Sequence, residues 1–289
     1  MLERFSWPGL ARYVYAPTML LGMNATAVAI TGSGRSAWLL GPLLGIAIAL
    51  SFLAEQVLPY HSDWNRPQGD RRRDAFHAIV NETANGAFIA ATPLLVAALG
   101  VNGRWPDALP FALQVLLAVV VFDAGITIAH WLSHKWQTLW RFHAVHHSVE
   151  RMYGFNGLMK HPLHQAVEMF AGATPLVLAG MPLDVAATLG FCTAVQLLLQ
   201  HSNVDYELGR LGRWIACNRV HRFHHLREAG AGDVNFGLFT TIWDRMLGTM
   251  VYNPSRNFTS HDLGLADCRA YPRDYLGQLR EPFRRRATT

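Results

Sequence analysis

Histidines are concentrated in two short segments of this 289-residue chain, at spacings that suit metal binding. Five of the fourteen histidines fall between residues 130 and 147, where an even spread would place about one. Each segment contains H-x-x-H-H, and in the first segment H-x-x-x-H precedes it. Residues three and four apart on a helix share a face, so each segment can aim two or three imidazoles at one point. The eight candidate ligands are His130, His134, His143, His146, His147, His221, His224 and His225.

The number of imidazoles indicates more than one ion. A single histidine on an apolar face is usually a core residue, but the density and the repeated spacing favour ligation here. A catalytic zinc takes about three protein ligands and a structural zinc four, so eight histidines predict two metal ions. Imidazole binds zinc, copper, iron and nickel alike, so ligand type alone leaves the metal open. No H-E-x-x-H occurs, which excludes the common zinc-protease motif.

The composition indicates that these histidines are positioned by a membrane protein. Charged residues make up only 16% of the chain and hydrophobic residues 51%, whereas soluble domains average about 25% charged residues. Asp184 separates the last two apolar runs, which are short for two full spans. The runs that predict four to six spans are 13–31, 37–54, 83–103, 108–122, 169–183 and 185–200.

Basic residues predict the orientation. Four arginines lie between the second and third runs (Arg66, Arg71, Arg72 and Arg73), whereas the connections at Arg35 and Arg104 carry one each. The positive-inside rule therefore places the four-arginine segment in the cytoplasm, and alternating spans bring both histidine segments to that side. Because the chain is rich in alanine and arginine, we expect a bacterial inner membrane.

The net charge of +5 does not predict a nucleic-acid partner. The basic residues gather in the four-arginine segment and in a tail ending in three arginines at 284–286, where they would meet anionic lipid headgroups. The alternation of aromatic and basic residues typical of single-strand binders does not occur. Three scattered cysteines predict reduced thiols.

We predict an all-α fold, a multi-span membrane helical bundle with a cytoplasmic helical cap that carries a dimetal site. The predicted regions are a transmembrane part at 1–129, a histidine-rich catalytic part at 130–255 with an apolar helical pair at 166–200, and a polar basic tail at 256–289. Asp123 lies in an apolar run shortly before His130, where a carboxylate needs a partner. We expect it to accept a proton from an imidazole ligand, and a contact with a neighbouring helix or with the four-arginine segment is the alternative.

Several segments together resemble one superfamily. They are HWLSHKWQTLWRFHAVHHS from His130, QHSN at 200–203, NRVHRFHHL from Asn218, NFG from Asn235 and WDRMLGT from Trp243. In order and spacing they resemble the fatty acid hydroxylase and sterol desaturase superfamily of integral membrane, non-haem di-iron oxygenases. The resemblance covers residues 120 to 250, and the first 60 residues show no such match.

The resemblance implies roles for particular residues. The eight histidines become ligands of two iron ions, for which zinc can substitute in purified material, and His201 becomes a ninth ligand. Some members have a further histidine where this chain has Asp205, so that residue is open as a ligand, an orienting group or a helix cap. His161 in K-H-P is a further candidate ligand. Interface packing is expected to account for His61, His77 and His164.

The implied activity is an O2-dependent hydroxylation or desaturation of a fatty acyl, sterol or related lipid, entering sideways from the bilayer. No flavin or haem domain is evident, so two electrons must come from a ferredoxin, a cytochrome b5-like protein or a reductase. The pattern G-x-G-x-x-A at 32–37 lacks a preceding strand and predicts a turn. The competing hypothesis is a histidine-rich zinc-binding or metal-transport protein, although transport favours ionisable groups within several spans. A bis-histidine haem carrier fits H-x-x-H-H poorly.

Overall fold

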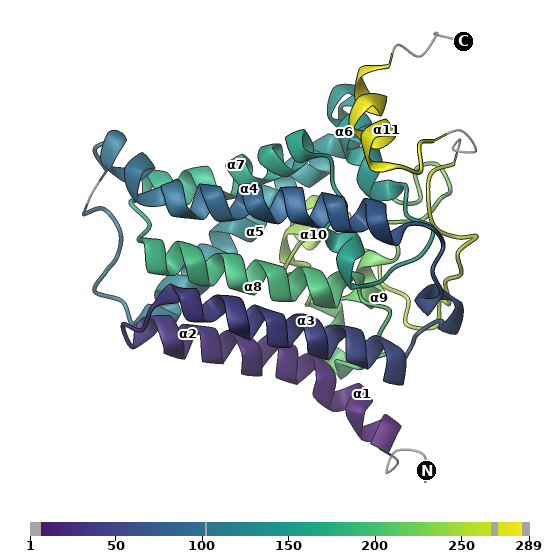
Figure 1. The fold of residues 1–289 in the computed structure, drawn as a ribbon, viewed down its shortest axis with the longest axis horizontal. Coiled ribbons are helices and arrows are strands. Elements are labelled where there is room, and N and C mark those ends of the chain that lie inside the picture. The colour runs from purple at the N-terminus through teal and green to yellow at the C-terminus, as the bar shows by residue number, and fades with distance from the viewer. Residues whose placement is uncertain (1–6, 102, 267–270, 285–289) are drawn as a thin grey trace.

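The computed structural model describes residues 7–101, 103–266 and 271–284, and over these ranges the fold is all-helical. Only isolated β-bridges occur in the described part of the chain. Figure 1 shows long helices running side by side along the longest axis of the molecule. The predicted helical membrane bundle is thus confirmed.

Four helical segments are long and apolar enough to cross a membrane: Gly9–Gly32, Ala37–Val57, Phe111–Lys135 and Leu183–His201. The first comprises α1 (Trp7–Pro17), a π-helical stretch at Thr18–Met23 and α2 (Asn24–Gly32). The second comprises a short 3-10 turn at Ala37–Leu39 and α3 (Leu40–Val57), and the last two are α5 (Phe111–Lys135) and α8 (Leu183–His201). These four agree with the runs predicted at 13–31, 37–54, 108–122 and 185–200.

The other two predicted runs have different bounds. The run at 83–103 belongs to α4 (Arg71–Ala98), whose first half is polar, so it is not among the four candidate spans. The run at 169–183 overlaps α7 (Pro162–Leu178), whose 17 residues are fewer than those of any of the four candidate spans. The chain turns at Gly180, which has a φ of +82°, and Pro182 precedes α8. Asp184 therefore lies in the first turn of α8 and does not form the break.

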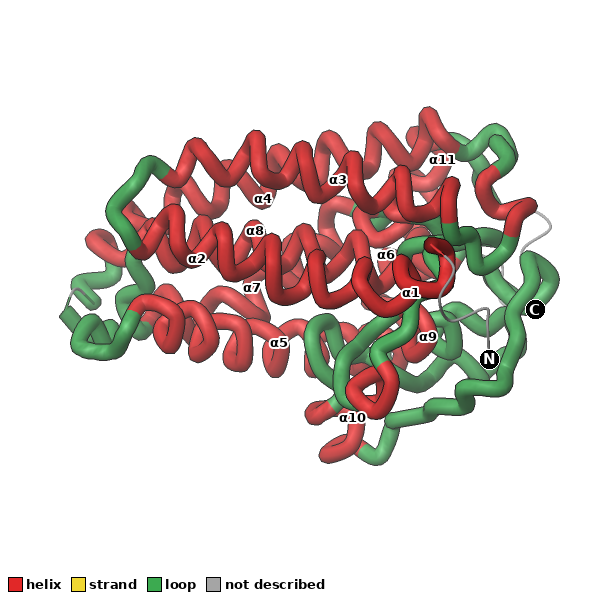
Figure 2. The backbone as a smooth tube through the Cα atoms, turned by 90° about the horizontal axis from the view of Figure 1, so that it is seen from below, coloured by secondary structure: helices red, strands yellow, loops and turns green. Residues whose placement is uncertain are grey.

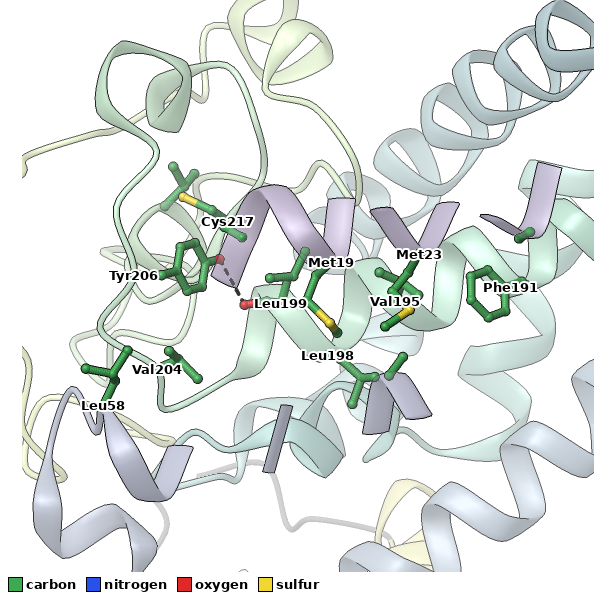
Figure 3. Packing of buried hydrophobic residues seen from close by; sticks show 14 of the residues in the cluster. Met19, Met23, Leu58, Phe191, Val195, Leu198, Leu199, Val204, Tyr206 and Cys217 are labelled. Carbon is green, nitrogen blue, oxygen red and sulfur yellow. Dashed lines mark hydrogen bonds between the residues drawn. The ribbon is translucent and has the colours of Figure 1, made fainter. Parts of the chain in front are cut away.

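Helix α8 is the centre of the bundle and packs against α2, α3, α4 and α5 (Figures 1 and 2). Figure 3 shows Met19 and Met23 of the first segment against Val195 and Leu198 of α8, and this apolar cluster continues to the end of the helix. There Tyr206 donates a hydrogen bond to the carbonyl of Leu199 (3.1 Å).

Glycines allow α5 and α7 to approach closely. A Cβ atom on Gly125 would lie 2.2 Å from the carbonyl oxygen of Ala171, and one on Gly172 would lie 2.6 Å from the ring of Phe122. Small residues bring helix backbones together in membranes in the same way. The contact sets the first turns of α7 beside the last turns of α5.

The short helices and most of the loops lie at one end of the bundle, where α3, α5 and α8 end, and shorter loops join the long helices at the opposite end (Figure 2). The short helices there are α6 (Gln137–His147), α9 (Asn218–His221), α10 (Ile242–Leu247) and α11 (Tyr275–Arg280), with 3-10 turns at Ser62–Asn65, Gly154–Leu158, Gly209–Arg213 and Glu281–Phe283. Helix α5 runs across the predicted boundary between residues 129 and 130. The predicted polar tail at 256–289 contains α11, whose residue Gln278 hydrogen-bonds to His77 (2.9 Å).

The predicted free thiols agree with the structure where it describes them. Cys192 and Cys217 are free and buried. Cys268 and the arginines at 285 and 286 lie outside the described residues.

Candidate metal centre

The structure brings the nine histidines singled out from the sequence into two groups. In each group, the potential ligand atoms all lie within 4.8 Å of one another. We call the first histidine group His130, His134, His143, His147 and His224, and the second histidine group His146, His201, His221 and His225.

The two triplets divide their histidines between the groups in the same way. His130 and His134 lie in the last turns of α5, His201 ends α8, and each H-x-x-H-H triplet contributes to both groups. The two histidines four residues apart in a triplet belong to one group, and the middle histidine belongs to the other. The first triplet lies on α6, whereas His224 and His225 lie in the turn that follows α9. The groups are adjacent, since the ring centroids of His147 and His225 are 5.0 Å apart.

Oxygen acceptors fix the tautomers of three histidines in the first histidine group. The Nδ1 atoms of His130 and His224 lie 2.9 Å from the carbonyl oxygens of Phe236 and Val234. The Nδ1 of His134 lies 2.8 Å from the carboxylate of Asp233. Since these oxygens carry no proton, each Nδ1 is the donor, and each Nε2 presents a lone pair to the group.

The arrangement of these lone pairs fits a bound cation. The Nε2 atom of His130 is 2.8 Å from that of His224, and the Nε2 atoms of His134 and His147 are 3.1 Å apart. Unprotonated nitrogens at such distances repel each other unless a positive charge lies between them.

In the second histidine group, the surroundings of His201 also fit a bound cation. It is buried, and neither of its ring nitrogens has a hydrogen-bond partner among the described residues. An unsatisfied buried polar group costs about 1–3 kcal/mol, and metal ligation would remove that cost. The imidazole set fits a pair of transition-metal ions.

Burial keeps these imidazoles neutral. Desolvation, followed by the neighbouring imidazoles, lowers the pKa values of His143, His146, His147, His221 and His224 well below the usual value. The pKa of His225 falls to about 3, chiefly by burial. At neutral pH, all six are therefore unprotonated, as metal ligands must be.

This burial predicts that acid destabilises the metal-free protein. The pKa of an unfolded histidine is about 6.5, and the folded values are lower. The contribution of these histidines to the free energy of unfolding is therefore fully present above pH 6.5 and is lost as the pH falls below that value. Each buried histidine then contributes a loss of about 1.4 kcal/mol per pH unit until its folded pKa is reached. Thermal unfolding in detergent, recorded from pH 7.5 to 5, should show a steep fall in the midpoint below pH 6.5. A flat profile would contradict the burial of neutral imidazoles.

The segment from Asp233 to Thr240 gives a role to the N-F-G motif. Asn235 adopts a left-handed backbone (φ 56°), and its side chain bonds to Val220 and Val251. The carbonyls on either side of Asn235 are the acceptors for His224 and His130. Asp244 of the W-D-R motif accepts hydrogen bonds from the amides of residues 236 and 237, and Gly248 ends α10.

The expected contact between Asp123 and an imidazole is wrong. Its carboxylate accepts hydrogen bonds from the amides of Leu238, Phe239 and Thr240 and from the Thr240 hydroxyl, at 2.8–3.0 Å. The four hydrogen bonds involve both oxygens of the Asp123 carboxylate. The residue therefore acts on His130 only through the loop that carries the Phe236 carbonyl. Asp233, which sequence reasoning missed, makes the carboxylate–imidazole contact expected of Asp123.

The remaining sequence candidates lie outside the two groups. Asp205 pairs with Arg12 and with Arg219 (3.0 Å), so its oxygens are held by guanidinium groups. His161 caps α7 by accepting from the amide of Leu163 (3.1 Å), and its Nε2 faces a backbone carbonyl. His164 was expected to pack at the membrane interface but is buried beside His143.

His77 and His61 are the last two sequence candidates outside the two groups. His77 was also expected at the interface, but it is buried and hydrogen-bonded at both ring nitrogens. His61 stacks on Trp64, at a centroid distance of 5.6 Å.

Two cavities bear on access to the centre. A cleft of about 390 Å³ is lined by His134 and His147 of the first histidine group and by Trp140, and it carries charges of both signs. Its charged lining residues are Lys135, Arg227, Glu228 and Asp233. An apolar cavity of about 330 Å³ lies between α3, α4 and α8, but its described lining includes none of the nine histidines. The cleft that reaches the histidines therefore has both charged and apolar lining residues.

Comparison with known proteins identifies the family. Residues 115–249 match the fatty acid hydroxylase family model. The chain is 37% identical over 250 residues to ornithine lipid hydroxylase OlsE of Rhizobium tropici, covering 83% of this chain and 74% of that protein. It is 28% identical over 129 residues to alkylglycerol monooxygenase of Xenopus tropicalis, covering 45% of this chain and 28% of that protein.

This chain belongs to the fatty acid hydroxylase family, as the sequence motifs predicted. Its four apolar helices and its family make it an integral membrane protein. No solved structure gives a significant match.

Proposed function

We propose that this protein is a membrane-bound, O2-dependent hydroxylase of a polar lipid that uses two iron ions. The observation that carries the proposal is the convergence of nine imidazoles into two adjacent groups, with tautomers set by Asp233 and by two loop carbonyls. The first histidine group would hold one ion and the second histidine group the other. When bound, the ions supply the activation of O2 and the oxidising power for a C–H bond.

The chain's own residues supply orientation and dryness. The loop at 233–240 holds His130, His134 and His224 with each Nε2 directed inward, and burial of the groups excludes bulk water. The chain would receive its two electrons from a ferredoxin, a cytochrome b5-like protein or a reductase. By the positive-inside argument, that protein would dock on the cytoplasmic face, in a bacterial inner membrane.

The cleft beside the first histidine group suggests which lipids fit. It combines apolar walls at Trp140 and Leu226 with the ion pair Lys135–Asp233 and with the charged side chains of Arg227 and Glu228. Such a lining suits a zwitterionic headgroup joined to an apolar chain, and the 37% identical relative is named as an ornithine lipid hydroxylase. We therefore propose entry of the polar end of the lipid through this cleft, in place of the purely apolar sideways entry expected from the sequence.

The proposal is tested by reconstitution. Protein loaded anaerobically with Fe²⁺ is supplied with a ferredoxin, its reductase and NADPH as the electron source, with O2 and with four candidate substrates: an ornithine lipid, an alkylglycerol, a free fatty acid and a sterol. We expect O2 uptake and a product 16 mass units heavier with a polar lipid. A product 2 units lighter would indicate desaturation. Protein that binds no transition metal would refute the proposal, and zinc flux in vesicles without O2 uptake would favour the transport alternative.

A further inference from the structure

A buried polar cluster lies against the first histidine group, at the start of α7. Lys160, His164 and Glu168 are 7%, 1% and 1% exposed, and neither the motifs nor the family match assigns them a role. The ammonium group of Lys160 pairs with Oε2 of Glu168, while the backbone carbonyl of Lys160 accepts from Asn81 (3.0 Å). The cluster is thus held in place from α4 as well as from α7.

His143 is the member of the first histidine group that faces this cluster. Its Nε2 lies 3.0 Å from the Nε2 atoms of His130 and His147, so this nitrogen points into the group. Its Nδ1 is buried and has no hydrogen-bond partner among the described residues. If Nε2 ligates a metal, Nδ1 carries the proton and needs an acceptor.

Two acceptors without partners lie within reach. Ser133 donates its hydroxyl proton to the carbonyl of Ala129 (2.7 Å), so its oxygen accepts from Nε2 of His164 (2.9 Å). The Nδ1 of His164 is therefore an unprotonated acceptor, and it has no partner among the described residues. Oε1 of Glu168 is likewise buried without a partner, 3.8 Å from that nitrogen.

The hydrogen-bonding capacity of these three atoms matches one water molecule. Ligand atoms of His143, His164 and Glu168 all lie within 4.8 Å of one another, a span that two hydrogen bonds through a single oxygen cover. One N–H donor and two acceptors correspond to a water that accepts once and donates twice. A third cation fits less well, since the charge of Glu168 is already balanced by Lys160.

We propose that His164 and Glu168 are positioning residues that hold His143 in its ligating tautomer through one buried water. The inference rests on the proposed metal centre. It gives His143 the outer partner that Asp233 and the loop carbonyls give to other members of the group. Loss of such a partner typically lowers metal affinity by about 10–100-fold.

Two substitutions at one position separate the two contacts of His164. His164→Asn places an amide oxygen where Nδ1 lies and gives up the contact with Ser133. His164→Gln reaches Ser133 but leaves no acceptor beside His143. His161→Asn is the matched control, because it alters a histidine three residues away and retains an N-cap side chain for α7.

The experiment is a Co²⁺ titration in detergent, with competition by a chelator, the visible spectrum of the bound ion and the thermal midpoint of each metal-free variant. We expect two ions per wild-type chain. His164→Gln should bind one of them about 10–100-fold more weakly, with a changed spectrum, whereas His164→Asn and His161→Asn should stay within about threefold of wild type.

The other outcomes are separable. Wild-type affinity in His164→Gln would overturn this inference and leave the metal centre standing. Equal weakening in His164→Asn would show that the effect does not depend on an acceptor beside His143, because this variant keeps that acceptor. A third ion per chain that His164→Gln loses would assign the cluster to a cation. Both results also overturn the inference. Failure of the wild type to bind any ion would refute the proposed function and this inference together.

Discussion

Replacing His146 with alanine is expected to remove one bound metal ion, and replacing His147 with alanine is expected to remove the other. These neighbours in α6 belong to different groups. Each variant should retain about one ion per chain and lose more than about 100-fold in hydroxylation, because a ligand contributes more than the outer partners whose loss costs about 10–100-fold. Metal analysis of the purified variants and product formation from the lipid panel measure the two effects.

A histidine outside the centre provides the control for this pair. His261 is exposed in the tail, so His261→Ala should keep two ions and full activity. Two ions in either His146→Ala or His147→Ala would contradict the division into two groups.

Asp123→Asn is expected to weaken the first histidine group without altering a ligand. The carboxylate accepts four hydrogen bonds from the loop, whereas an amide offers one oxygen and turns its NH₂ group toward the remaining donors. Buried donors left unsatisfied cost about 1–3 kcal/mol each, so we expect the unfolding free energy to fall by about 2–4 kcal/mol. The freed loop should also lower the affinity for one ion by about 10–100-fold, because it carries the acceptor of His130.

Chelator competition and thermal unfolding test this prediction, with Asp205→Asn as the control. Asp205 is also an aspartate with several partners, but these are arginines, and the residue is partly exposed and outside both groups. Its substitution should therefore change the free energy of unfolding by no more than about 1 kcal/mol. Equal behaviour of the two variants would show that the loop does not depend on Asp123.

Local spacing explains why the histidines could be predicted from sequence and their partners could not. The triplets ending at His147 and His225 each place three imidazoles within five consecutive residues, so their closeness depends only on local geometry. Asp233 contacts a histidine 99 positions earlier, and the Phe236 carbonyl serves one 106 positions earlier. No periodicity encodes such pairs, since they depend on where a loop settles after the helices pack.

Hydropathy located uniformly apolar helices more closely than a mixed one. Helix α3 agrees with its predicted run and α5 contains most of its run, because an apolar stretch with few charges is sufficient to mark them. Helix α4 combines the four-arginine segment's last residues with an apolar second half, so it begins 12 residues before the uncharged stretch predicted at 83–103 and is not among the four candidate spans. His164 was misjudged for a related reason: a single histidine gives no periodic signal, and its surroundings come from the close α5–α7 contact at Gly125.

The left-handed turn at Asn235 has a consequence for biosynthesis. A nascent chain that stops at residue 232 already contains every imidazole of the centre, the last of them being His225, yet neither carbonyl beside Asn235 exists to assign their protons. The acceptors that fix the tautomers of His130 and His224 therefore form only after the segment beyond Gly232 has been made and folded.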